Sequence, residues 1–150
     1  MSGSDTVWLV FTLESPTPAG AFTTFPDIEA VCAGWLRDQA LTDVGARVYT
    51  EVPPDPTFPL VTVRRVGGVP AIRQYLDTAS IQVDVWGSSK AEAQDVARDA
   101  RLELHRLEGA HVLEPLAFVH AVDDSLGLTW LPDDLSGRAR YTFGVLVYYR

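Results

Sequence analysis

Three histidines and one cysteine are the residues of this sequence best suited to metal binding or nucleophilic catalysis. His105 falls in a predicted helix, His111 in the loop after it and His120 in a predicted strand. Their spacing matches no metal-ligand pattern, and Cys32 has no second cysteine with which to share a metal or form a disulfide. Cys32 also lies on the apolar stripe of a predicted helix, where it is expected to be a small core side chain. We therefore predict no metal, no cofactor and no thiol nucleophile.

Two acidic pairs and a glycine pair are the next residues that could carry chemistry. Asp123-Asp124 and Asp133-Asp134 could serve as paired carboxylates in acid–base or divalent-metal chemistry. Each pair lies beside a turn or loop signal, where aspartate is favoured for local hydrogen bonds. Gly67-Gly68 lacks both the P-loop lysine and the spaced glycines of a dinucleotide site, so it is predicted to be a loop with unusual backbone angles. Because each of these pairs has a structural explanation, we predict that the protein is not an enzyme.

One local concentration of positive charge stands out in an acidic chain. Arg64 and Arg65 are adjacent, and Arg73 follows a few residues later. In an acidic protein such a patch can meet an acidic protein surface, or it can be a solvated edge of a sheet. Both interpretations stay open at this stage.

Asp84 lies on the polar side of the strand predicted at the centre of the sequence. Gln82 and Trp86 share its face, because successive strand side chains point to opposite sides. This face is neither fully apolar, as expected of a core face, nor fully polar, as expected of a solvent-exposed face. It can contact another chain, since aromatic residues are enriched at interfaces, or it can carry a second apolar layer of the same chain.

The elements that position these residues are organised around residues 78–108, where a strand leads directly into a helix. The face of the strand opposite Asp84 is apolar and consists of Ile81, Val83 and Val85. Ser89 and Glu92 have the spacing of a capping box, which begins the helix, and Gly109 is predicted to end it. The pattern predicts an amphipathic helix packed on a sheet.

The remaining elements follow from hydrophobic periodicity and from Pro and Gly positions. They are a helix from Pro26 to about Leu41, strands at 46–52, 60–66 and 116–122, and a long alternating strand at 140–150. The strand at 60–66 is expected to end at Gly67-Gly68 before an excursion at 69–77, and Asp123-Asp124 is expected to form a turn. The order, about α-β-β-β-α-β-β, predicts an α+β fold with a mostly antiparallel sheet flanked by two main helices.

The 150 residues are expected to form one domain with an N-terminal extension. Residues 1–24 are predicted to be partly flexible, with a possible edge strand at Val7–Leu13, and residues 25–150 to form a single α+β domain. The apolar run near the start is too short to span a bilayer and lacks the pattern of a signal peptide, so no membrane partner is expected.

The formal net charge of −8 bears on nucleic-acid binding. Binding that depends on phosphate contacts needs clustered Lys and Arg, so a nucleic-acid partner held in this way is disfavoured. DNA that passes nearby without being held is compatible with this charge.

Four stretches of the sequence, in this order, resemble the tail terminator (tail completion) proteins of long-tailed bacteriophages. They are PLVTVRRVGG, DTASIQVDVWGSSKAEAQDVARDARLEL, WLPDD and RYTFGVLVYYR. The resemblance covers roughly residues 25–150 and rests on the order of the elements rather than on one signature motif.

The resemblance implies a structural virion protein of the siphovirus type that assembles as a hexameric ring in the host cytoplasm. Such a ring caps the head-proximal end of the major tail tube, stops its polymerisation, offers a surface to the head-completion or connector protein and leaves a channel for DNA. Because a ring interface joins two different surfaces, complementary residues are expected on two sides of the subunit. The candidates for subunit or partner contacts are Arg64, Arg65, Arg73, Asp84, Trp86, Trp130 and Asp133.

Three other functions remain open from the sequence. The first is another head–tail connector or neck protein. Binding to the tail tube would indicate a terminator, and binding on the portal side would indicate a connector or neck protein. A nucleic-acid-binding α+β module could stack bases on an aromatic sheet face, although the sequence has no RNP-like stretch. A small-molecule enzyme would need a pocket of converging polar groups that the sequence does not locate.

Overall fold

The computed structural model describes residues 24–72 and 75–150, which form two helices and a six-stranded sheet. The elements are α1 (Ile28–Asp38), β1 (Val48–Tyr49), β2 (Leu60–Ile72), β3 (Leu76–Gly87), α2 (Lys90–His105), β4 (His111–Leu113), β5 (Leu116–Trp130) and β6 (Ala139–Tyr149). The predicted α+β class and element order are confirmed, with β4 as an additional short strand. The strand predicted at Val7–Leu13 and Arg73 lie outside the described residues.

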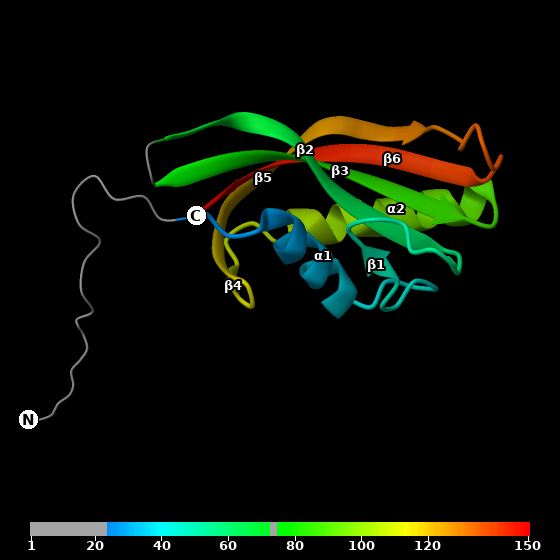
Figure 1. Ribbon diagram of the computed structural model, residues 1–150, viewed down its shortest axis with the longest axis horizontal. Coiled ribbons are helices and arrows are strands. Elements are labelled where there is room, and N and C mark those ends of the chain that lie inside the picture. Colours follow the sequence, from blue (N-terminus) through cyan, green and yellow to red (C-terminus); the bar gives the residue numbers. More distant parts are fainter. Residues whose placement is uncertain (1–23, 73–74) are drawn as a thin grey trace, which may run out of the picture.

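The sheet has the strand order β1-β2-β3-β6-β5-β4, and every neighbouring pair is antiparallel except β1 with β2. Both helices lie on the same side of this sheet (Figure 1). No helix of the described residues covers the other side of the sheet, which is called the open face below.

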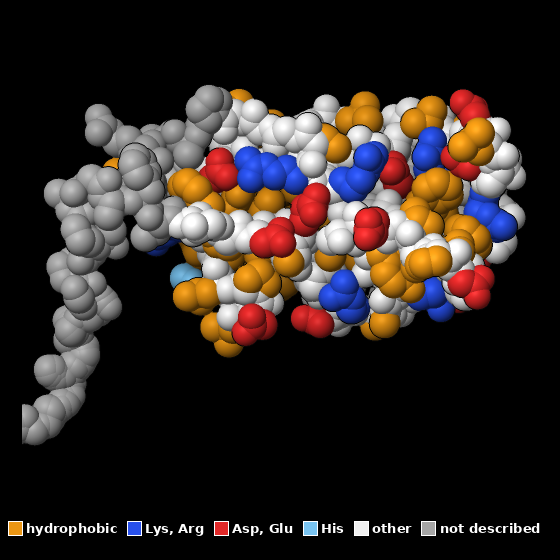
Figure 2. Space-filling view, viewed as in Figure 1, with side chains coloured by type: hydrophobic (Ala, Val, Ile, Leu, Met, Phe, Trp, Pro, Cys, Tyr) orange, Lys and Arg blue, Asp and Glu red, His pale blue; other side chains and the backbone are white. Residues whose placement is uncertain are grey.

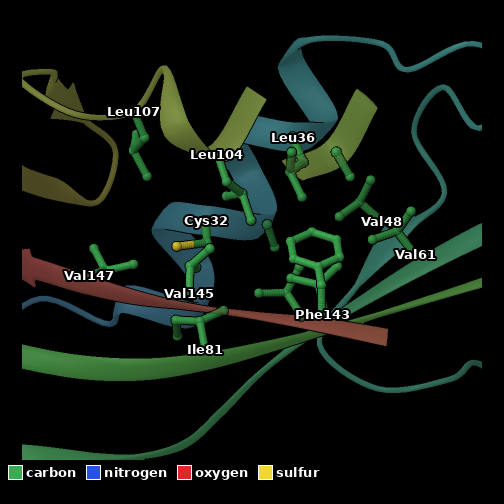
Figure 3. Packing of buried hydrophobic residues seen from close by; sticks show 14 of the residues in the cluster. Cys32, Leu36, Val48, Val61, Ile81, Leu104, Leu107, Phe143, Val145 and Val147 are labelled. Atoms are coloured by element: carbon green, nitrogen blue, oxygen red, sulfur yellow. The ribbon is translucent and has the colours of Figure 1, made fainter. Parts of the chain in front are cut away.

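The core lies between the helices and the sheet. The predicted apolar face of β3 is correct, because Ile81, Val83 and Val85 are each fully buried there. The alternating side chains of β6 extend the same layer, and α2 covers it with its apolar stripe (Figure 3). Cys32 is buried within this cluster, and burial raises the pKa of its thiol to about 12. Its surroundings therefore keep the thiol protonated at neutral pH.

α2 begins at its predicted cap, α1 begins two residues after the predicted start at Pro26, and each helix ends earlier than expected. Asp27 caps α1, and its carboxylate accepts a hydrogen bond from the Ala30 amide at 3.3 Å. Ser89 caps α2 in the same way, as predicted. The end predicted for α1 near Leu41 is wrong because Ala40 adopts a φ of 50°, which does not continue a right-handed helix.

The predicted stop of α2 at Gly109 is also displaced, since the helix ends at His105. Gly109 instead takes a φ of 81° in the turn before β4, where its amide donates to the Val119 carbonyl of β5 at 2.8 Å. The left-handed conformation that favours glycine is thus used one turn beyond the helix.

The predicted strand end at Gly67-Gly68 is wrong, and so is the excursion predicted at 69–77. β2 continues through the glycines to Ile72 and forms a long hairpin with β3, with a register shift between Arg65 and Gly67. A Cβ atom on Gly68 would lie 2.1 Å from the Thr78 carbonyl oxygen. The glycine therefore permits a close approach of two paired strands rather than ending one of them.

Two other predicted strands have different lengths. The strand predicted at 46–52 is reduced to Val48–Tyr49, which pairs in parallel with the start of β2. The turn predicted at Asp123-Asp124 is wrong, because β5 continues to Trp130 beside β6. Pairing with the long strand β6 outweighs the local preference of aspartate for turns. Residues of β5 that do not fit regular pairing are accommodated by shifts in its register with β6.

Candidate functional site

The open face carries a group of polar and aromatic side chains from three adjacent strands, which we call the open-face cluster. Its members are Arg64, Gln82, Asp84, Trp86 and Arg140. Strand pairing explains their meeting: Arg64 lies opposite Gln82, and Trp86 lies opposite Arg140. Three residues predicted to form an interface, Arg64, Asp84 and Trp86, are therefore neighbours in the structure.

Asp84 is the buried acid at the centre of this cluster, with only 5% of its surface exposed. Its two carboxylate oxygens accept from Gln82 Nε2 at 3.2 Å and from Arg64 Nη2 at 3.5 Å. Because an unpaired buried charge is costly, these partners are needed to keep the carboxylate on this face. The Arg64 side chain is half exposed, so it is available to solvent or to another chain.

Arg140 links the cluster to the β5–β6 turn. Its guanidinium lies over the Trp86 ring, 4.9 Å from the centroid, which is a cation–π arrangement. Its Nε donates to the Leu131 carbonyl at 2.8 Å, and Nη1 lies 4.0 Å from an oxygen of Asp133. Sequence reasoning did not single out Arg140. Its position opposite Trp86 depends on the β3–β6 register, which local sequence patterns do not specify.

A shallow cavity of about 300 Å³ lies over the cluster. The segment Thr50–Val52, which follows β1, forms part of its wall. Two polar atoms on this face, Nε1 of Trp86 and Oγ1 of Thr142, are buried without a hydrogen-bond partner among the described residues. A buried polar group left unpaired costs about 1–3 kcal/mol, so these two atoms lower the stability of this face.

Arg65 lies on the other side of the sheet from Arg64, so the two arginines do not form one patch. Its Nη1 donates to Asp77 Oδ2 at 3.2 Å and to the Tyr149 hydroxyl oxygen at 3.0 Å. Tyr149 in turn donates its hydroxyl hydrogen to Asp77 at 2.6 Å. This network joins β2, β3 and β6 at the helix-side layer, where Arg65 supports the fold.

The Asp77 network perturbs the ionisation of its two weak acids. Burial opposes ionisation of Asp77, but hydrogen bonds from Tyr149 and Arg65 outweigh burial and lower the pKa of this carboxyl. For Tyr149, burial and the hydrogen bond to Asp77 raise the pKa of the phenol. The network is therefore an ionised carboxylate held by a neutral tyrosine and a cationic arginine.

Trp130 and Asp133 lie near the end of β5 but have different surroundings. Trp130 is 37% exposed, its ring packs on Tyr141 at 5.3 Å between centroids, and the Lys90 ammonium lies 4.9 Å from its centroid. Asp133 accepts from Ser136 in the β5–β6 turn, and these hydrogen bonds lower the pKa of Asp133. Asp133 is near the open-face cluster through Arg140, whereas Trp130 faces the N-terminal end of α2.

Several of the residues considered for catalysis make contacts with other side chains of the fold. Asp124 pairs with Arg101 and with Nε2 of His105, the latter at 2.8 Å, and the hydrogen bonds from Arg101 and then His105 lower the pKa of Asp124 to about 2. His111 and His120 pack against the Phe118 ring. Within residues 24–72 and 75–150, no group of three or more His, Cys, Asp and Glu could hold a metal ion.

Another hollow, of about 720 Å³, lies away from the open-face cluster. It is an open groove between α2 and the segment after α1, with the acidic residues Asp43, Glu92, Asp95 and Asp99 in its lining. Neither helix described by the structure is long and apolar enough to cross a membrane.

The fold and the cluster define a two-layer α+β domain with a polar and aromatic face, and aromatic and Arg residues are enriched at protein interfaces. The family described as Tail completion protein gp17 matches residues 29–131 of this chain. The chain belongs to this family, and it is therefore a structural protein of the bacteriophage tail, located in the virion, that contacts other tail components. The family is not one of enzymes. No curated protein matches the chain.

Proposed function

We propose that the protein forms a sixfold ring that caps the head-proximal end of the phage tail tube. The ring ends polymerisation of the major tail tube protein and then offers a surface to the head-completion or connector protein. Assembly takes place in the host cytoplasm before the tail joins the head. The observation that carries this proposal is the open-face cluster, where the half-exposed Arg64 lies beside Trp86 and the buried Asp84, on a member of a tail completion family.

The proposed ring surrounds a channel through which DNA passes without being held. The net charge of −8 supports this role, because DNA would be repelled by most of the surface. On the face shown in Figure 2, Lys and Arg side chains alternate with Asp and Glu side chains and do not gather into one basic stripe. A nucleic-acid-binding module would need such a stripe.

We propose Arg64, Asp84 and Trp86 as one side of the contact between subunits. Aromatic and Arg residues carry much of the affinity of protein interfaces, and half-exposed charges set orientation. Asp133 is proposed to extend this contact surface beyond Arg140, and Trp130 is proposed as a separate contact near the N-terminal end of α2. Arg65 supports the surface from behind through Asp77 and Tyr149.

We also propose that residues 25–150 form a single tail-terminator-like domain and that residues 1–24 are an extension of it. Limited proteolysis of the assembled and unassembled protein tests this division. Early cleavage confined to residues 1–24 is expected, since exposed chain ends are the preferred sites of nicking. Early cleavage within the sheet would contradict it.

Negative-stain electron microscopy tests the proposed function directly. The purified protein is imaged alone at high concentration and then mixed with tail tubes. Sixfold rings, or density capping one end of the tubes, are the expected result. Binding to the portal side with no binding to tubes would favour a connector role instead, and a monomer that ignores both would overturn the proposal.

A further inference from the structure

The cavity over the open-face cluster is rich in hydrogen-bond donors that the chain does not use. A guanidinium has five N–H donors, and Arg64 and Arg140 each use only part of theirs. A ligand of this cavity therefore has to bring acceptors, such as a carboxylate or backbone carbonyls.

The same cavity has an apolar part beside these donors. The Trp86 ring lines it, and Val52 on its wall is 45% exposed. A ligand that fits combines an acceptor with aliphatic side chains on either side of it.

The turn between β4 and β5 has this combination. Leu113 is 81% exposed and Leu116 is 74% exposed, while Glu114, between them, is also exposed. Two leucines at one turn present more apolar surface to water than an ordinary polar turn does, and a carboxylate flanked by leucines matches a cavity that has donors beside an indole ring.

The turn and the cavity lie at opposite ends of the subunit. Leu116 begins β5 beside the end of β6, whereas Arg140 stands at the start of β6, next to the end of β3. Figure 1 shows β4 in the left half of the view, inward from the β2–β3 hairpin, and the β5–β6 connection at the right end. Two different surfaces at opposite ends of one chain are what a head-to-tail ring contact requires.

We infer that the β4–β5 turn of one subunit docks in the open-face cavity of the next subunit in the ring. Leu113 and Leu116 pack against Trp86 and Val52, and the Glu114 carboxylate accepts hydrogen bonds from the free donors of Arg64 and Arg140. This inference rests on the proposed function, because it names the contact that closes the proposed ring.

Disulfide trapping between two full-length variants tests the contact. One preparation carries Val52→Cys and the other Leu113→Cys, and the two are mixed and oxidised under the conditions that give rings. Cys32 is fully buried and does not compete. A disulfide joining the two variants is expected, and a chain carrying both substitutions should give a covalent ladder that ends at the ring.

The matched control replaces Leu113→Cys with Leu102→Cys, since Leu102 is a half-exposed leucine on α2. Val52→Cys should not cross-link to it. Rings seen by electron microscopy with no Val52–Leu113 disulfide, or with equal cross-linking to Leu102→Cys, would overturn the docking and leave the proposed function standing. Absence of rings under every condition would overturn the proposed function and the docking with it.

A second measurement uses affinity rather than cross-linking. Leu113→Ala combined with Leu116→Ala removes side chains that are mostly exposed in the monomer, so the melting temperature should change little. The association constant of the ring should fall by about tenfold or more, because well-packed side chains at the centre of an interface carry most of its affinity. Unchanged association by sedimentation would contradict the docking.

Discussion

Asp77, Arg65 and Tyr149 show how a single buried hydroxyl can hold a charged group in this fold. The Tyr149 hydroxyl is 2.6 Å from the Asp77 carboxylate and also accepts from Arg65. Deleting it leaves the carboxylate partly unsatisfied in a site with little exposure to water.

Tyr149→Phe should therefore lower the free energy of unfolding by about 1–3 kcal/mol. Urea unfolding followed by circular dichroism measures this loss. Tyr148→Phe is the matched control, because Tyr148 lies next in sequence on the other face and its half-buried hydroxyl is outside the network. Equal effects of the two substitutions would show that the hydroxyl of Tyr149 has no special role.

Asp124 gives the protein a defined response to acid. Its pKa is lowered from 3.8 to about 2 in the folded state. A lowered carboxyl pKa contributes stability that is present above the unfolded value and is lost as pH falls through the folded value. The loss therefore occurs between about pH 4 and pH 2, and the lowered pKa of Asp77 contributes a loss of the same sign.

Asp124→Asn should remove the part of this acid sensitivity that belongs to the Arg101 and His105 contacts. At neutral pH the cost should stay below about 1 kcal/mol, since exposed ion pairs are screened by solvent. Melting temperatures of both proteins from pH 7 to pH 2 provide the measurement. A slope between pH 4 and pH 2 that is unaltered by the substitution would contradict the role of Asp124.

At the scale of the elements, the long β2–β3 hairpin depends on a glycine within a strand. Adding a methyl group at Gly68 brings it to 2.1 Å from the Thr78 carbonyl oxygen, whereas nothing lies within 4 Å of a Cβ built on Gly67. The adjacent glycines therefore differ in what they permit.

Gly68→Ala should lower the free energy of unfolding by about 1–3 kcal/mol, because paired strands must move apart to accept the methyl group. Gly67→Ala, its neighbour and control, should change stability much less. Hydrogen exchange of the β2–β3 hairpin, with global unfolding beside it, measures both variants. If Gly67→Ala proved the more damaging substitution, the strand pairing described here would be wrong.

At the scale of the whole molecule, the open face is the surface expected to contact other subunits. Arg64 is half exposed, and Asp84 keeps Gln82 as a partner when the guanidinium is removed. Arg64→Gln should therefore change monomer stability by less than about 1 kcal/mol.

The same Arg64→Gln variant should weaken ring assembly by about tenfold or more, because a charged partner is lost at a desolvated contact. Analytical ultracentrifugation at several concentrations measures this change. Arg98→Gln, an exposed arginine on α2, serves as the control and should assemble normally. If both variants assembled equally well, Arg64 would be removed from the contact.

The fold class followed from local patterns because its main elements repeat a clear period. The β3 alternation, the Ser89 cap of α2 and the alternating last strand each depend on neighbours a few residues away. The ends of β2 and β5 did not follow, because glycines and aspartates that favour turns were overruled by pairing with β3 and β6. Pairing between distant strands has no local signature.

For the site, sequence alternation alone placed Gln82, Asp84 and Trp86 on one face, since side chains of a strand alternate whatever their partners are. Tertiary structure decided the rest. Strand register brought Arg140 over Trp86, and it separated Arg64 from Arg65, because adjacent strand residues point to opposite sides of a sheet. The sequence thus determined the elements and their faces, whereas the three-dimensional pairing determined which side chains meet, because that depends on contacts between residues far apart in the chain.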